Sequence, residues 1–100
     1  MNGAATALKL PAVLTHAVAS GFAVAMARDI PGQQGEIVVD ASALDQFDSS
    51  ALAVLLECRR LALVAGKGFS VWAAPARLLQ LAGVYGVMEL IPAAPLAPAR

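Results

Sequence analysis

One short segment constrains the fold of this chain more than any other, the β-branched run within residues 36–41. Ile37, Val38 and Val39 follow one another without the polar alternation that a half-buried strand would show. Such a run is typical of a central strand that is covered on both faces, as in a parallel sheet. Because parallel neighbours need crossover connections, the flanking segments are expected to contain helices. The chain is therefore predicted to be an α/β protein.

The remaining segments alternate between strand and helix patterns. Residues 6–14 alternate weakly and contain Pro11, which fits an edge strand, and residues 69–73 alternate as a further strand. Together these segments predict the order strand, helix, strand, helix, strand, helix, with parallel neighbouring strands and crossover helices. The expected helices run from the N-cap Thr15 to about Asp29, from about Ser49 to Ala65 with Gly66 at its C′ position, and from Pro75 to about Leu90.

The length of the chain, 100 residues, suits a single domain. We expect residues 1–92 to form it and residues 93–100 to form a Pro/Ala-rich tail that frays. Hydrophobic residues make up 59% of the chain and charged residues 14%, where an average domain has about 25% charged residues. A small domain cannot bury so much apolar surface, so part of it is expected to face a partner. The alternative is simple alanine enrichment, because alanine is tolerated on a surface.

The charged and reactive residues argue against several function classes. Seven basic and seven acidic residues cancel and are scattered, so nucleic-acid binding is not expected. His16 is the only histidine and has no cluster of ligands around it, so neither a metal nor another cofactor is expected. Cys58 has no histidine beside it, which favours a buried, inert thiol. Nothing in the sequence brings His16 to Ser49, so no catalytic residue is predicted and the chain is not expected to be an enzyme.

A secretion signal is the main alternative to a cytoplasmic location. Residues 10–27 carry no formal charge, and residues 25–27 resemble a cleavage site. Cleavage there would delete a strand and a helix that the core needs, and a transmembrane helix would need about 20 strongly apolar residues. A cytoplasmic protein is predicted, which reaches the membrane only through a partner. The apolar character of residues 10–27 is interrupted, which argues against both a signal peptide and a transmembrane helix. The interrupting residues are Pro11, Thr15, His16, Ser20 and Gly21.

The turn Asp48-Ser49-Ser50 lies between the central strand and the second helix. The first N–H groups of that helix have no internal partner, and the positive end of its dipole points to the turn. The turn could therefore be a helix cap, an anion site or a phosphorylation switch. Capping by Asp48 or Ser49 is expected, whereas no basic side chain can be assigned to the turn, which argues against an anion site. A phosphate on Ser49 would act mainly on a docked partner.

The segment that contains this turn resembles the signature of STAS domains, the anti-sigma-factor-antagonist family. It reads Ile-Val-Val-Asp at residues 37–40, then Leu44, Phe47 and Asp-Ser-Ser-Ala-Leu-Ala-Val-Leu-Leu at residues 48–56. In the switch members of that family the first hydroxyl after the aspartate is phosphorylated, and it corresponds to Ser49. Alanine stands at position 51, where the family favours glycine. The resemblance extends over about residues 8–92. It implies a single STAS domain, with a mainly parallel or mixed β-sheet of about four strands and with three to four helices.

The third predicted helix resembles the closing helix of MlaB-type proteins within this family. Residues 81–92 read Leu-Ala-x-x-Tyr-Gly-Val-x-Glu-Leu-Ile-Pro. MlaB-type proteins are small cytoplasmic subunits of the ABC system that moves phospholipids between the inner and outer membranes. The resemblance implies a non-enzymatic accessory subunit that supports outer-membrane lipid asymmetry. It would bind the transporter ATPase, and through it the permease, at the inner-membrane face.

The resemblance also implies which residues dock. In the transporter interpretation Ser49 is an interface hydroxyl and not a phosphoacceptor. The alternative is an anti-sigma-factor antagonist that is switched by phosphorylation of Ser49, with an anti-sigma factor kinase as its partner. A STAS-like module with an unrelated partner is a third possibility. The predicted partner-binding residues are Asp48, Ser49, Ser50, Leu52 and Tyr85.

Overall fold

All strand pairs in the described part of the protein are parallel, and the predicted α/β class is confirmed. The computed structural model describes residues 6–33 and 35–95. One sheet has the strand order β1-β3-β5, and a small second sheet pairs β2 with β4. The strands are β1 (Thr6–Lys9), β2 (Val13–Leu14), β3 (Ile37–Asp40), β4 (Gln46–Phe47) and β5 (Phe69–Trp72). The helices are α1 (His16–Asp29), α2 (Ser50–Val64) and α3 (Ala76–Val84), with the short 3-10 helices η1 (Ile30–Gly32) and η2 (Met88–Leu90).

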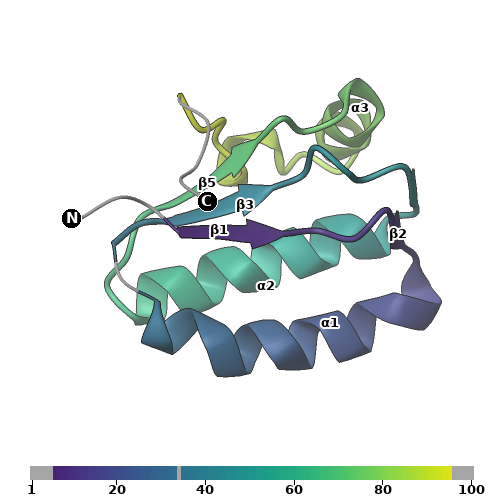
Figure 1. Ribbon diagram of the computed structural model, residues 1–100. Coiled ribbons are helices and arrows are strands. Elements are labelled where there is room, and N and C mark those ends of the chain that lie inside the picture. The colour runs from purple at the N-terminus through teal and green to yellow at the C-terminus, as the bar shows by residue number, and fades with distance from the viewer. Residues whose placement is uncertain (1–5, 34, 96–100) are drawn as a thin grey trace.

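The core lies between the sheet and two parallel helices. α1 and α2 run side by side across one face of the sheet (Figure 1). On β3, Ile37 and Val39 belong to the core cluster beneath these helices and are 0% exposed. Val38 lies on the opposite face of the strand and is still only 5% exposed. The prediction of a central strand covered on both faces is therefore confirmed.

The segment 6–14, predicted as one edge strand, forms two strands in two different sheets. β1 does lie at the edge of the main sheet, and its pairing with β3 ends where the Leu10 N–H donates to the Asp40 carbonyl at 2.9 Å. Pro11 follows, and because it has no N–H it cannot continue the ladder. The chain then enters β2, which pairs only with β4.

The third helix is shorter than predicted. The sequence predicts a helix that reaches about Leu90, but α3 ends earlier because Gly86 takes a φ of +71°. The Val87 N–H donates to the Ala82 carbonyl at 2.9 Å, which closes the helix in a Schellman motif. The chain then turns into η2. α2 ends in the same way at Gly66, whose φ is +73°, as the sequence predicts.

Two glycine-to-alanine substitutions test this helix end. Gly86→Ala is expected to destabilise the protein by about 1 kcal/mol, because a residue with a Cβ is strained at positive φ. Gly83→Ala is the matched control within α3, where an added Cβ meets nothing within 4 Å. This control should stabilise the protein by about 0.5 kcal/mol. Urea unfolding of both variants measures the difference, and equal effects would contradict the role assigned to Gly86.

The residues after η2 lie along the free edge of β5. The Val71 N–H donates to the Pro92 carbonyl at 2.9 Å, and the Ala94 N–H donates to the Val71 carbonyl at 2.8 Å. Ala93 forms a parallel bridge with Val71. The predicted fraying is therefore wrong for these residues, while residues 96–100 lie outside the described part. The domain boundary after Pro92 stays a prediction.

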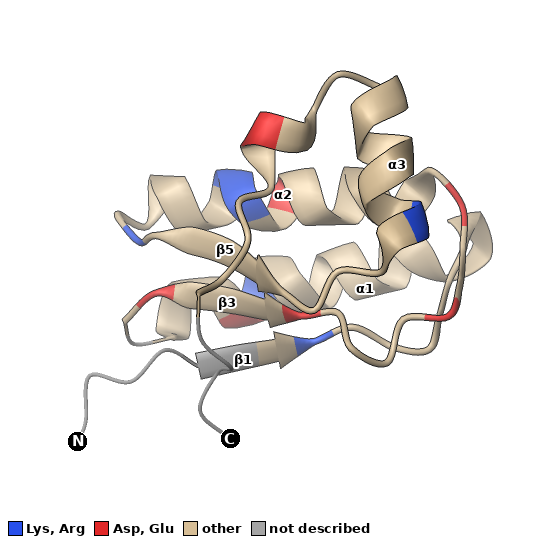
Figure 2. Cartoon of the chain, turned by 90° about the horizontal axis from the view of Figure 1, so that it is seen from above, with Lys and Arg blue, Asp and Glu red and all other residues tan. Residues whose placement is uncertain are grey.

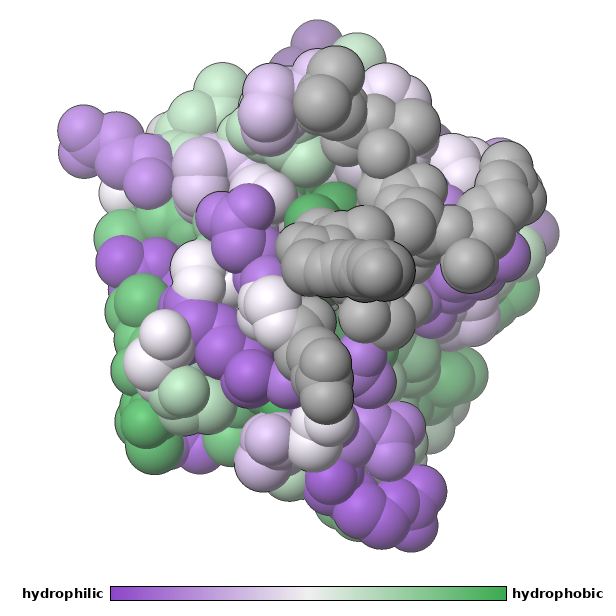
Figure 3. Space-filling view, turned by 60° about the vertical axis from the view of Figure 1, so that its left-hand side comes forward, coloured by the Kyte–Doolittle hydropathy of each residue, from purple (hydrophilic) through white to green (hydrophobic). Residues whose placement is uncertain are grey.

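The surface combines sparse charges with scattered apolar residues. In the described part of the fold, the Lys and Arg residues and the Asp and Glu residues are spread without a single-sign stripe (Figure 2). On the face that Figure 3 shows, hydrophobic side chains form separate patches between hydrophilic ones. Among residues 6–33 and 35–95, no helix is both long enough and apolar enough to cross a membrane.

Candidate functional site

The carboxylate of Asp48 connects the first turns of two helices. Its Oδ2 accepts a hydrogen bond from the backbone N–H of His16 at 3.1 Å. Its Oδ1 accepts one from the backbone N–H of Ser50 at 2.8 Å. α1 begins at His16 and α2 begins at Ser50. One side chain therefore caps two helices that lie far apart in the sequence.

These two bonds also fix the charge state of the carboxylate. The His16 N–H is the larger cause that lowers the pKa of Asp48, and the Ser50 N–H is the second. Both donors favour the ionised form, and so do the positive ends of the two helix dipoles. Asp48 is thus held as an anion whose two oxygens already have partners.

The register of the small sheet explains why His16 reaches the turn. Leu14, the last residue of β2, pairs with Phe47, the last residue of β4. The two segments therefore leave this sheet side by side, one into α1 and the other into α2. No sequence pattern brings His16 to the turn, but the fold places its backbone N–H on Asp48. Thr15 does occupy the N-cap position of α1, but its side chain makes no capping hydrogen bond. Asp48 in the other chain segment takes over this role.

The two serines of the turn differ in their surroundings. Ser49 is exposed, has helical dihedral angles (φ −62°, ψ −16°) and makes no capping hydrogen bond with its side chain. Ser50 is half-buried, and its hydroxyl contributes to the lowered pKa of Asp48. Of the two predicted cap residues, Asp48 is thus the acceptor, and Ser49 presents its hydroxyl to the surroundings.

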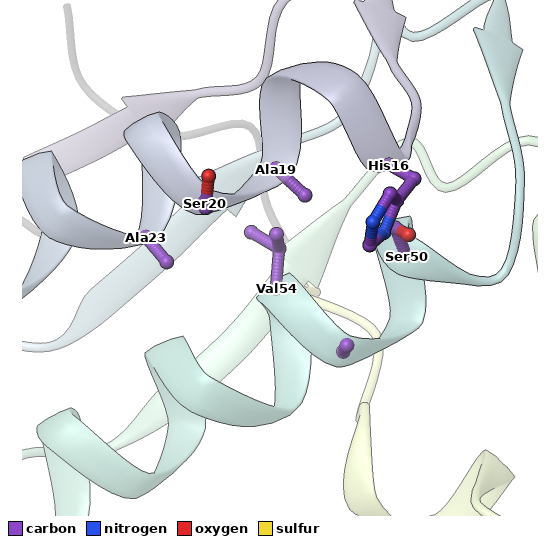
Figure 4. A pocket seen from close by; sticks show the side chains of 7 residues that line it. His16, Ala19, Ser20, Ala23, Ser50 and Val54 are labelled. Carbon is purple, nitrogen blue, oxygen red and sulfur yellow. The ribbon is translucent and has the colours of Figure 1, made fainter.

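A groove runs between α1 and α2 next to the turn. Its volume is about 360 Å³, and small side chains line most of it (Figure 4). Ser50 lines the groove and also bonds to Asp48, so the groove and the turn form one continuous surface. The lining contains no Asp, Glu, Lys or Arg. Its residues are His16, Ala19, Ser20, Ala23, Ser50, Ala53 and Val54.

A basic side chain contacts the residue that precedes the turn. The Cζ of Arg77 lies 4.5 Å from the centroid of the Phe47 ring, in a cation–π contact. Phe47 directly precedes Asp48, and the start of α3 lies near the loop that leads into α2 (Figure 2). No hydrogen bond or ion pair among the described residues joins Arg77 to the turn itself, so the argument against an anion site stays a prediction. No sequence pattern links Arg77 to Phe47, because the contact depends on how α3 packs.

The other two predicted docking residues lie elsewhere. Leu52 is 4% exposed and packs in the core, so its side chain is not available to a partner. Tyr85 is 58% exposed and is the C-cap of α3, at the opposite end from Arg77. No hydrogen bond, ion pair or ring contact among the described residues joins Tyr85 to the turn. The structure therefore brings together Asp48, Ser49 and Ser50, and adds His16 and Arg77, which the sequence analysis did not include.

A group of exposed apolar side chains lies at the end of α3 and in η2. Its members, here called the α3–η2 patch, are Val84 (82% exposed), Tyr85 (58%), Met88 (48%) and Leu90 (36%). Exposed apolar side chains of this size are a common feature of protein–protein contacts. The patch lies at the C-terminal end of α3. The N-terminal end of α3 carries Arg77, which contacts Phe47 next to the turn.

Side chains that could bind a metal ion are not grouped in the described part. Among residues 6–33 and 35–95, no three His, Cys, Asp or Glu side chains are placed to share a metal ion. Cys58 is 1% exposed, and burial raises the pKa of its thiol to about 12. It is therefore protonated at neutral pH and poorly nucleophilic.

Comparison with known proteins agrees with this geometry. The family model described as "Mlab, STAS domain" matches residues 1–92, which include all the helices and strands described above. No curated protein matches the chain significantly.

Proposed function

Because this chain belongs to the STAS-domain family described as "Mlab, STAS domain", we propose that it is an accessory subunit of an ABC transporter. STAS domains are generally non-enzymatic modules that mediate protein–protein interactions. In this proposal the chain binds the ATPase subunit in the cytoplasm and stabilises its assembled, active form. It meets the permease and the inner membrane only through that ATPase. The transporter moves phospholipids and maintains the lipid asymmetry of the outer membrane.

One observation supports docking at the turn more than any other. The two hydrogen bonds of Asp48 fix the turn to both helices, while Ser49 projects from it with an uncommitted hydroxyl. A surface that is already rigid loses little conformational entropy when a partner binds. A small polar side chain at the centre of such a surface can fix the register of the contact.

The proposed contact surface has two parts. The first is the turn Asp48-Ser49-Ser50 with the adjoining groove, and the second is the α3–η2 patch that contains Tyr85. The patch would supply apolar area, and the turn would supply polar specificity. Leu52 is left out of this surface because it is buried.

Co-purification tests this proposal. We expect the chain to form a stable complex with the ABC ATPase and permease of the same organism when the three are co-expressed. Deletion of the gene should weaken the outer-membrane barrier against detergents and large antibiotics. If the chain fails to co-purify and the deletion leaves the barrier unchanged, the proposal is wrong.

The alternative function is an anti-sigma-factor antagonist that is switched by phosphorylation of Ser49. The exposure of Ser49 favours it, because a kinase can reach the hydroxyl without unfolding the turn. The ionised Asp48 next to it opposes the added charge. Mass spectrometry after incubation with an anti-sigma factor kinase and ATP distinguishes the two functions, since only the switch requires one phosphate on Ser49.

A further inference from the structure

We propose that Arg77 is the charge-bearing contact of the docking surface and that it receives a carboxylate from the partner ATPase. This inference rests on the proposed function and adds to it the chemistry of the partner's side. It is carried by the orientation of Arg77, by its lack of an acidic partner and by its position at the start of α3.

The guanidinium of Arg77 is oriented by a fixed aromatic platform. Phe47 is half-buried, packs against the core cluster and pairs with Leu14 in the small sheet. The Arg77 Cζ lies 4.5 Å above the centre of this ring. Stacking occupies one face of the guanidinium and leaves the N–H groups at its edge free to donate. These donors match the two oxygens of a carboxylate.

Arg77 has no acidic partner within residues 6–33 and 35–95. The ion pairs there join Arg28 to Asp29 at 3.7 Å and Arg60 to Glu57 at 2.6 Å. Asp48, the acid of the adjoining turn, already accepts two backbone hydrogen bonds. No hydrogen bond or ion pair among the described residues joins Asp48 to Arg77.

The position of Arg77 is unfavourable for an isolated domain. It lies in the first turn of α3, where the helix dipole disfavours a positive side chain. No acidic residue stands in that turn, and the N-cap residue Pro75 offers no side-chain cap. The contact with Phe47 offsets this cost only in part, because an exposed cation–π pair is weak. A residue that departs from a local rule without internal compensation often serves a function.

An incoming carboxylate would reverse this balance. It would meet the guanidinium and the positive end of α3 together, and both favour a negative charge. The chain as a whole has no net charge and no basic stripe, so a single acidic side chain fits this site better than a polyanion does.

Association kinetics with the purified ATPase test this inference. Arg77→Gln should lower the association rate constant by about tenfold and flatten its dependence on salt, because a charged contact near the rim acts mainly on the encounter. Arg77→Glu should weaken binding further, and Arg77→Lys should fall between wild type and Arg77→Gln. Arg28→Gln, at the far end of α1, makes the same charge change and should leave both quantities unchanged.

The outcomes separate this inference from the proposed function. If wild type binds and Arg77→Gln binds with the same rate and salt dependence, the inference is overturned while the proposed function stands. If wild type does not bind the ATPase, both are overturned. Thermal unfolding of the Arg77 variants serves as the folding control. As a positive test, one ATPase variant with a surface acid changed to lysine should restore binding to Arg77→Glu.

Discussion

Replacing Asp48 with alanine is expected to loosen the first turns of α1 and α2 at the same time. The N–H groups of His16 and Ser50 lose their acceptor, since both bond to this carboxylate. Exchange of these two amide hydrogens with solvent should accelerate by on the order of tenfold or more. The melting temperature should fall as well, although Asp48 is an exposed side chain. Hydrogen exchange followed by NMR, together with thermal unfolding, measures both effects.

Two further substitutions identify the cause. Asp45→Ala changes another exposed acid in the same loop and should have little effect on either helix. Asp48→Asn keeps one carbonyl oxygen as an acceptor, so it should retain one of the two hydrogen bonds and show an intermediate loss. The double-cap explanation fails if Asp48→Ala exchanges and melts like Asp45→Ala.

The same carboxylate predicts how stability depends on pH. The pKa of Asp48 is lowered in the folded protein, so the unfolded state binds the proton more readily. The stabilisation is therefore complete above the unfolded pKa of about 4 and is lost as pH falls through the lower folded value. The difference in melting temperature between wild type and Asp48→Asn should shrink on acidification below about pH 4. Glu57, whose pKa is also lowered by Arg60, titrates in both proteins and does not produce this difference.

The sequence was informative where one local pattern determines the structure. Ile37, Val38 and Val39 predicted the buried central strand correctly, because residues buried on both faces of a sheet leave a continuous apolar run. Gly66 marked the end of α2 for a similar reason, since few other residues adopt its positive φ. Gly86 also has a positive φ and follows the end of α3. The prediction extended this helix past Gly86 to about Leu90, and it was wrong there.

The candidate site depends on contacts that no local pattern encodes. β2 and β4 are two residues long each, too short for a recognisable strand pattern, yet their pairing brings His16 to Asp48. Arg77 reaches Phe47 only because α3 packs near the loop before α2. The sequence was sufficient to locate the turn. The capping of α1 by Asp48 and the contact of Arg77 with Phe47 could be seen only in the folded structure.

Substituting Ser49 with glutamate is expected to reduce binding of the ATPase by about a hundredfold or more. In the proposed complex the new carboxylate would be buried next to the ionised Asp48, and an unpaired charge at an interface costs about 3 kcal/mol or more. Ser49→Ala removes the hydroxyl without adding a charge and should bind far more strongly than Ser49→Glu. Ser42→Glu is the matched control, because it adds the same charge at another exposed serine outside the turn.

The effect of Ser49→Glu on the fold should have the opposite sign. Residue 49 lies at the N-terminus of α2, where the helix dipole favours a negative side chain, so the free domain should be as stable as wild type or slightly more stable. A loss of binding can therefore not be explained by unfolding. Calorimetric titration with the ATPase and thermal unfolding of the free variant measure the two quantities separately. Unchanged binding by Ser49→Glu would place the turn outside the interface, and the contact surface would then have to be sought at the α3–η2 patch.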